Sequence, residues 1–183
     1  MPFTEENSYA PNSPYASSKA GADHIVRAYQ KTYNLATTIS NCSNNYGPRQ
    51  HSEKLIPKII QNCFAKREIP IYGSGQQIRD WLFVTDHCVA INKILQHAKI
   101  GEKYNIGSNN EITNLVLAHK ICDIFNNIDT KFNHQKLITH VADRPGHDFR
   151  YAVDATKMKK QLQWQATTNF TQALLETIEF YKN

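Results

Sequence analysis

The chain has 183 residues, of which 40% are hydrophobic and 20% are charged, and its formal net charge is +5. This composition supports a packed core and excludes a disordered chain, and no apolar run approaches the roughly 18 residues of a membrane span. The basic residues are scattered apart from the cluster Lys157–Lys160, which favours a solvated helix face over a nucleic-acid-binding patch.

The first 50 residues predict one long helix, one strand and one turn. Ser13 precedes Pro14, a pair typical of a helix N-terminus, and an apolar stripe at helical spacing continues to Tyr33. An asparagine follows and fits a C-terminal cap. The β-branched stretch 35–40 then predicts a strand, and the polar segment 41–48 predicts a turn.

Helices and strands alternate along the rest of the chain, which predicts an α/β fold. Helices are expected over Leu55–Ala65, Thr85–His97, Thr113–Phe125, Ala155–Leu162 and Thr171–Tyr181. Strands are expected over Ile69–Tyr72, Asp80–Val84, Lys103–Ile106 and Leu137–Val141, with a loop over Ala142–Asp148 and a short extended piece at Tyr151–Asp154.

Tyr15 and Lys19 are the candidate catalytic pair in the first helix. Residues four apart lie on one helix face, with Cβ atoms on the order of 5–6 Å apart. A nearby ammonium favours the phenolate, which suits a tyrosine that exchanges a proton while a hydride leaves a carbinol. The spacing alone leaves a surface tyrosine on a solvated helix as the alternative, because short motifs also arise by chance.

The seven glycines argue against a complete dinucleotide-binding unit. None lies in a Gly-x-Gly-x-x-Gly or Gly-x-x-Gly-x-x-Gly pattern after a strand. Such a turn lets the backbone approach a pyrophosphate at a helix N-terminus. The chain is therefore expected to lack the glycine-rich segment that binds NAD.

The cysteines and histidines predict no metal site. Cys42, Cys63, Cys88 and Cys122 form no Cys-x-x-Cys pair, and no two histidines have His-x-x-x-His spacing. Since the sequence shows no secretory signal, these cysteines predict free, buried thiols in a reducing cytoplasm.

Seven segments occur together in one order along the chain. They are Ser13–Ala20, Asn41–Pro48, Glu53–Pro57, Pro70–Gly73, Gln77–Leu82, Tyr104–Gly107 and Ala142–Asp148. In this order they resemble the C-terminal part of the dTDP-glucose 4,6-dehydratases, a family of extended short-chain dehydrogenase/reductases. The Arg79-Asp80-Trp81 motif and the segment from Asp143 to Asp148 point to the dehydratases more than to sister epimerases and decarboxylases.

The resemblance implies a fold and a domain organisation. Residues 1–50 would be the C-terminal remnant of a Rossmann-like parallel sheet, with the tyrosine helix and the following strand. Residues 51–183 would form the smaller α/β domain that binds a sugar nucleotide. The family binds NAD, dehydrates dTDP-glucose to its 4-keto-6-deoxy product, and serves cell-surface polysaccharide pathways such as rhamnose biosynthesis.

The resemblance also implies a role for each matched position. Tyr15 would take the proton of the sugar 4-hydroxyl, and Lys19 would favour the phenolate and bond the nicotinamide ribose. Asn45 would contact the cofactor, and Asn44 the substrate near its diphosphate. The other implied substrate contacts are Glu53, Lys54 and Leu55 in the cleft, Ile69, Pro70 and Ile71 around the thymine, Arg79 and Arg144 on the diphosphate, and Asn114 and His147 on the nucleotide.

Two departures from the family leave alternatives open. The stretch Arg49–Ser52 replaces a more apolar, proline-containing one, and the family's N-terminal half has no counterpart in the chain. Three interpretations therefore stay open. The chain could be a dehydratase part that is inactive alone, a non-catalytic fragment that binds a sugar nucleotide, or another nucleotide-sugar epimerase or dehydratase. Arg79 could also pair with Asp80 as a structural ion pair. Without the N-terminal half, the first helix would expose apolar surface, which predicts a homodimer or further self-association.

Overall fold

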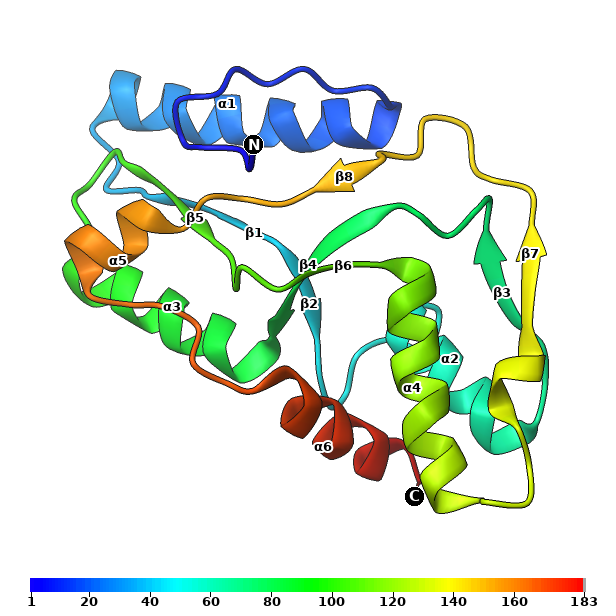
Figure 1. Ribbon diagram of the computed structural model, residues 1–183. Helices are drawn as coiled ribbons and strands as arrows, with labels where there is room; N and C mark the ends of the chain where they lie inside the picture. Colours follow the sequence, from blue (N-terminus) through cyan, green and yellow to red (C-terminus); the bar gives the residue numbers. More distant parts are fainter. Residues whose placement is uncertain (183) are drawn as a thin grey trace.

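The structure is a computed structural model that describes residues 1–182 of the chain (Figure 1). It is an α/β fold with parallel strand pairs and flanking helices, which confirms the predicted class. The helices are α1 (Pro14–Tyr33), α2 (Leu55–Ala65), α3 (Val84–His97), α4 (Asn114–Ile128), α5 (Thr156–Leu162) and α6 (Phe170–Lys182), and a 3₁₀ turn covers His134–Leu137. The strands are β1 (Ile39–Cys42), β2 (Asn44–Tyr46), β3 (Ile69–Tyr72), β4 (Ile78–Phe83), β5 (Lys103–Ile106), β6 (Glu111–Thr113), β7 (Ile138–Val141) and β8 (Arg150–Tyr151).

Helix α1 has the predicted bounds and lies along the upper edge of the molecule in Figure 1. Ser13 Oγ accepts a hydrogen bond from the Ala16 N–H at 3.1 Å, which caps the first turn, and Asn34 ends the helix in a left-handed conformation. No residue of α1 is buried, and Ile25 and Tyr29 are 60% and 51% exposed. The helix thus presents apolar side chains that residues 1–182 leave largely uncovered.

The segment after α1 departs from the prediction. β1 occupies Ile39–Cys42 rather than 35–40, and β2 occupies Asn44–Tyr46 inside the predicted turn. β1 pairs with β5, the Ser43 N–H then bonds the Ile106 carbonyl at 2.9 Å, and β2 continues alongside β4. Pairing with distant strands satisfies the backbone of this asparagine-rich stretch, whereas its local composition is typical of a turn.

The strands of residues 1–182 form three small sheets. β1 pairs with β5 and β3 with β7, both in parallel. β4 is central, with β2 and β8 parallel to it and β6 antiparallel. The register places Arg79 of β4 opposite both Ile112 of β6 and Tyr151 of β8, so that its backbone is held from two sides.

The starts of α3, α4, α5 and α6 each differ from the prediction by one residue. Phe83, not Thr85, is the N-cap of α3, because β4 runs directly into this helix. Thr113 caps α4 by accepting a hydrogen bond from the Val116 N–H at 3.2 Å, and this helix continues to Ile128. β6 ends at the cap residue Thr113 and was not predicted, since three residues are too few to show strand alternation.

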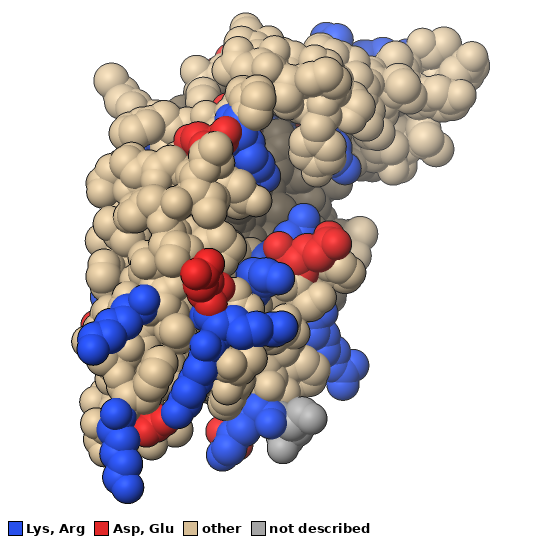
Figure 2. Space-filling view, turned by 90° about the vertical axis from the view of Figure 1, so that its right-hand side faces the viewer, with Lys and Arg blue, Asp and Glu red and all other residues tan. Residues whose placement is uncertain are grey.

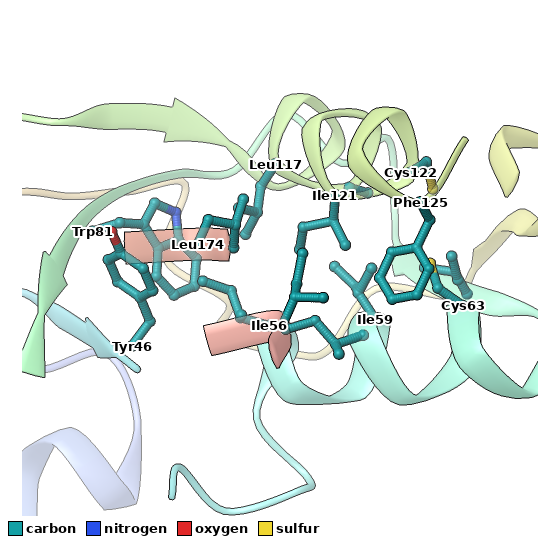
Figure 3. Close-up of a cluster of buried hydrophobic side chains, with 14 of the residues drawn as sticks. Tyr46, Ile56, Ile59, Cys63, Trp81, Leu117, Ile121, Cys122, Phe125 and Leu174 are labelled. Carbon is teal, nitrogen blue, oxygen red and sulfur yellow. The ribbon is translucent and has the colours of Figure 1, made fainter. Parts of the chain in front are cut away.

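The larger hydrophobic cluster joins α2, α4, α6 and the central strands. Figure 3 shows Ile56 and Ile59 of α2 facing Leu117 and Ile121 of α4, and all four are 0–1% exposed. Burial of one such side chain stabilises a fold by about 1.5–3 kcal/mol. Tyr46 of β2 and Trp81 of β4 close one end of the cluster with an edge-to-face contact at 6.4 Å. The cluster therefore ties the helical side of the molecule to the strand that carries Arg79.

A second cluster covers the other side of β4 and β5. It consists of Leu82, Ala90, Ile94, Tyr104, Ile106, Met158, Leu162 and Trp164. It packs α3 and α5 against β5, and Cys42 of β1 lies at its border. Within residues 1–182, no helix combines the length and the apolar character that crossing a membrane would need.

The four cysteines are free, but they are not all buried as predicted. Cys63 and Cys122 are buried, Cys42 is half-buried and Cys88 is exposed. Cys88 lies on the solvent side of α3, whose buried residues include Ala90 two positions further on. The prediction fails for Cys88 because burial on a helix depends on its face and not on residue type alone.

Candidate functional site

The loop between β7 and β8 carries the most closely connected of the predicted site residues. His147 Nδ1 lies 2.7 Å from Asp143 Oδ1, and His147 Nε2 lies 3.2 Å from Arg144 Nη2. The hydrogen bond with His147 holds the pKa of Asp143 below its usual range, and the Arg144 N–H adds to this effect. The loop therefore supports the Arg144 guanidinium through a chain of hydrogen bonds, an arrangement suited to a phosphate.

Arg79 lies half-buried beside this loop. Its Nη1 and Nη2 donate to the carbonyl oxygens of Ile78 and Asp148, both at 2.7 Å. Burial lowers the pKa of Arg79 most, the Asp148 carboxylate opposes this shift, and the charge of Arg144 adds to it. The positive charge of Arg144 near Arg79 favours an anion between or beside the two guanidinium groups.

Asp80 does not form the ion pair with Arg79 that neighbouring charges suggest. It is 1% exposed and its carboxylate accepts three hydrogen bonds, from the Ser108 N–H at 2.9 Å, the Ser108 hydroxyl at 2.6 Å and the Asn110 N–H at 2.8 Å. The acid of the Arg-Asp-Trp motif thus holds the turn between β5 and β6. Arg79 is left with carbonyl partners and keeps its charge available.

Gln77 connects the loop to α4 and is a site residue that the sequence analysis missed. Its Nε2 donates to Asp143 Oδ2 at 2.6 Å, and its carbonyl accepts the Asn114 N–H at 3.0 Å. Gln77 Oε1 and Asn114 Oδ1 are buried with no hydrogen-bond partner among residues 1–182. Gln77 lies just before β4, and local sequence provided no signal for its contact with Asp143, which is 66 positions away.

Strand β3 contributes to the site through one face only. Ile69 and Ile71 are 0% and 1% exposed and belong to the core cluster, so their side chains are turned away from the surface. Pro70 and Tyr72 alternate with them, and the Arg144 guanidinium lies 5.1 Å from the Tyr72 ring centroid. Tyr72, which the sequence analysis did not single out, therefore lies beside Arg144, whereas Ile69 and Ile71, the expected contacts of this strand, do not.

The predicted residues before α2 form no hydrogen bond with the arginines. Glu53 and Lys54 are exposed, and Leu55 is half-buried as the first residue of the helix. Glu53 Oε2 lies 3.8 Å from His51 Nδ1, and both side chains are largely solvated. Arg49 has a left-handed backbone (φ 66°), a strained conformation in the stretch that departs from the family pattern.

Asn44 and Asn45 lie on β2 with unused hydrogen-bonding capacity. Asn45 Nδ2 donates to Cys42 Sγ and to the Ser43 carbonyl, at 3.3 Å and 3.1 Å. The Oδ1 atoms of both asparagines are buried without a partner in the described residues. Gln50 Nε2 donates to the Asn45 carbonyl at 2.7 Å and fixes the following turn. A buried acceptor without a hydrogen bond destabilises the fold, so these two oxygens can accept hydrogen bonds from a ligand or a water molecule.

Tyr15 and Lys19 share one exposed face of α1. Lys19 Nζ lies 5.8 Å from the Tyr15 ring centroid, and Tyr15 is 73% exposed. The arginine loop reaches this helix through Gly146, where an added Cβ would lie 3.4 Å from the Asn12 carbonyl and 3.9 Å from Ser13 Cβ. The structure thus places the loop of Arg144 against the start of the helix that carries the tyrosine–lysine pair.

A hollow lies beneath the part of the molecule formed by α1. Figure 2 views the side of β3 and β7 and shows lysine and arginine side chains near this hollow, with fewer acidic ones. A separate cavity of about 490 Å³ opens between the N-terminal segment, α1 and the starts of β1 and β5, and neither Tyr15 nor Arg144 lines it. The predicted site residues therefore border an open surface and not this cavity.

The described residues fit one end of a dinucleotide. The partnerless Asn45 Oδ1 offers an acceptor to an amide or a hydroxyl, and the Tyr15–Lys19 face is open. A pyrophosphate needs backbone N–H groups in a glycine-rich turn at a helix N-terminus, and the glycine spacing of the sequence supplies none. The described residues thus offer polar groups that suit the reactive end of a dinucleotide, and the glycine spacing offers no cradle for its diphosphate.

Comparison with known proteins identifies the family of the chain and its relatives. The family described as GDP-mannose 4,6 dehydratase matches residues 1–177. The chain is 49% identical over 180 residues to dTDP-glucose 4,6-dehydratase of Salmonella typhimurium and 50% identical over 184 residues to that of Neisseria gonorrhoeae. These alignments cover 98% of the chain, but 50% and 53% of the two relatives. The chain therefore spans about half the length of the curated relatives it matches.

Solved structures show the same relationship. A dTDP-glucose 4,6-dehydratase of Bacillus anthracis in complex with NAD is 48% identical and superposes with a TM-score of 0.90, over 100% of the chain and 56% of that structure. The dTDP-glucose 4,6-dehydratase DesIV of Streptomyces venezuelae is 39% identical with a TM-score of 0.91, over 100% and 55%. A UDP-glucuronic acid 4-epimerase of Bacillus cereus, at 23% identity and a TM-score of 0.90, shares the fold alone.

Proposed function

The chain belongs to the GDP-mannose 4,6 dehydratase family, and we propose on this basis that it forms the C-terminal part of an NAD-dependent dTDP-glucose 4,6-dehydratase. The proposed reaction converts dTDP-glucose to dTDP-4-keto-6-deoxyglucose. The observation that carries the proposal is the joining of Arg79, Arg144 and His147 beside the start of the Tyr15 helix. An anion site next to a tyrosine–lysine pair suits a substrate with a diphosphate at one end and a reacting hydroxyl at the other.

In the proposed mechanism the chain binds the nucleotide and moves one proton. Arg79 and Arg144 hold the diphosphate, and Tyr72 lies where an aromatic base could stack beside Arg144. Tyr15 takes the proton of the sugar 4-hydroxyl, and Lys19 lies beside its ring on the same helix face. When bound, NAD supplies the acceptor for the hydride that leaves the same carbon. The buried Asn45 Oδ1 accepts a hydrogen bond from the reactive end of the cofactor.

Binding of dTDP should stabilise the chain, and Arg144 should carry most of the effect. At 100 times the Kd, a ligand stabilises the folded state by about 2.7 kcal/mol, which is roughly 5–11 °C in Tm for a chain of this size. We expect Arg144→Ala to remove most of this shift, because the diphosphate loses a guanidinium partner. Thermal unfolding with and without dTDP measures both results.

The matched control for this measurement is Arg67→Ala. Arg67 is an exposed arginine after α2 that uses only its backbone N–H in a turn, so the dTDP-dependent shift should be retained. UDP and GDP in the same assay report the base preference. An unchanged Tm at millimolar dTDP would contradict the proposed substrate class, and an equal loss in both arginine variants would contradict the role of Arg144.

We also propose that α1 mediates self-association, since it has no buried residue and exposes Ile25 and Tyr29. Sedimentation velocity at tens of micromolar chain should show a dimer or larger species. Ile25→Glu should shift it to monomer, whereas Leu95→Glu, at a 78% exposed leucine of α3, should not. A monomeric wild-type chain would oppose this proposal. The division at residues 50 and 51 and a cytoplasmic location stay predictions.

A further inference from the structure

Eight buried side-chain atoms in residues 1–182 have no hydrogen-bond partner, and they fall into two chemical groups. Six are oxygens, on Ser43, Asn44, Asn45, Gln50, Gln77 and Asn114, in or next to the predicted cofactor and nucleotide contacts. The other two are nitrogens, Trp81 Nε1 and Asn110 Nδ2. The oxygens thus lie at or beside the proposed nucleotide and cofactor site, whereas the two nitrogen donors do not belong to it.

Both donors belong to residues that line one cavity of about 180 Å³. It lies between β4, the turn after β5 and the segment before α6. Its lining residues are Tyr46, Trp81, Phe83, Asp86, Ser108, Asn110, Ala166, Thr168 and Phe170. None of the predicted site residues is among them, so the cavity is separate from the nucleotide site.

The walls of the cavity combine aromatic rings with one carboxylate. Tyr46 lies 5.6 Å from Phe83 and 5.3 Å from Phe170 between ring centroids, which builds an aromatic side. Asp86 is 8% exposed, and its Oδ2 accepts the Thr168 N–H at 3.1 Å, which leaves Oδ1 for another donor. No lysine or arginine lines the cavity.

We propose that this cavity is a binding site for a small neutral polyol. Buried donors without partners cost free energy until an acceptor reaches them, so the occupant needs oxygen acceptors for Trp81 and Asn110. It also needs a donor for Asp86. A hydroxyl group supplies both functions, and the aromatic side accommodates the C–H faces of a polyol.

The charge and the volume of the cavity further restrict which ligands can bind. An anion would be repelled by Asp86, with no basic side chain in the lining to compensate, and a simple cation would leave the two N–H donors unpaired. The volume equals that of about six water molecules at ~30 Å³ each, which matches a molecule with a similar number of non-hydrogen atoms. Glycerol and erythritol are the probes of this size and chemistry.

The two tryptophans of the chain allow a direct test. Trp81 lines the cavity and Trp164 does not, so a ¹H–¹⁵N spectrum of the 183-residue chain contains one indole signal for the site and one internal reference. Trp164→Phe assigns the two signals. We expect glycerol and erythritol to shift the Trp81 signal with a saturable, millimolar Kd and to leave the Trp164 signal in place.

A matched pair of variants tests the role of the carboxylate. Asp86→Asn keeps one acceptor for the Thr168 N–H but replaces the other oxygen with a donor, so the Kd should rise at least fivefold. Asp123→Asn, at an exposed position of α4, should leave the Kd unchanged. A dextran at equal mass concentration, too large to enter, should not shift the Trp81 signal.

Three results would overturn the proposal. One is a linear shift without saturation, or an equal shift of both indoles, which would mean that the cavity holds only water. Another is tighter binding of acetate or methylammonium than of glycerol. The third is an Asp86→Asn variant that binds polyol like the wild type. None of these results bears on dTDP binding, which depends on Arg144.

Discussion

Asp80→Ala is expected to lower the free energy of unfolding by about 3–5 kcal/mol. The Asp80 carboxylate is buried and accepts hydrogen bonds from the Ser108 N–H, the Ser108 hydroxyl and the Asn110 N–H. Alanine removes both acceptor oxygens and with them all three hydrogen bonds, which leaves the N–H groups of Ser108 and Asn110 in the β5–β6 turn without this partner. A domain of this kind is stable by about 5–15 kcal/mol, so the loss is a large fraction of the total.

Urea denaturation measures this effect as a change in midpoint at constant slope. Asp80→Asn should lower the free energy of unfolding by less than Asp80→Ala, because one side-chain oxygen can still accept hydrogen bonds from the turn. Glu179→Ala removes an exposed acid from α6 and should change stability by less than about 0.5 kcal/mol. A loss below 1 kcal/mol for Asp80→Ala would show that the turn does not depend on the carboxylate.

Tyr15→Phe is expected to reduce dehydratase turnover by roughly 10²–10⁴-fold. The assay combines this chain with the part of the Salmonella typhimurium relative that it does not cover, as a fusion or a mixture, and follows NAD-dependent formation of the 4-keto product from dTDP-glucose. Phenylalanine keeps the ring and removes the hydroxyl that takes the proton. The dTDP-dependent rise in Tm should be unchanged, since Arg144 and Arg79 are intact.

The control for this experiment is Tyr29→Phe, which removes the hydroxyl of another exposed tyrosine on the same helix. It should retain turnover within about threefold. The 183-residue chain alone should show none, because the glycine spacing provides no diphosphate cradle for NAD. Turnover by the chain alone, or an active Tyr15→Phe enzyme, would contradict the proposed mechanism.

The fold was predictable wherever local chemistry and tertiary packing agree. Ser13 and Pro14 define the start of α1, and α2 and β3 have their predicted bounds. The prediction fails at 39–46, because asparagines in this stretch are typical of turns and its strands form only by pairing with β5 and β4. Such pairing joins residues 64 positions apart for β1 with β5 and 37 positions apart for β2 with β4, so it leaves no local pattern in the sequence.

For the candidate site, the sequence indicated charged residues that lie near one loop, and it did not indicate their neutral neighbours. Arg79, Arg144 and His147 are brought together as the resemblance implies, although their roles stay predictions. Gln77 and Tyr72 were missed, because their place depends on which strand face meets the loop. Ile69 and Ile71, which were expected around the thymine, have buried side chains in the core. The residue type alone does not show which face of the strand is buried.

The contact at Gly146 has a consequence for communication between the two ends of the site. The loop of Arg144 meets the start of α1 at this glycine, whose positive φ of 70° strains any side chain, and an added Cβ would lie in van der Waals contact with the Asn12 carbonyl. A diphosphate that immobilises the loop would therefore also restrict the helix that holds Tyr15. By thermodynamic reciprocity, ordering that helix would tighten the loop around the diphosphate by the same factor. On the proposed function, Gly146 is thus the point at which nucleotide binding at the loop and ordering of the Tyr15 helix would be coupled.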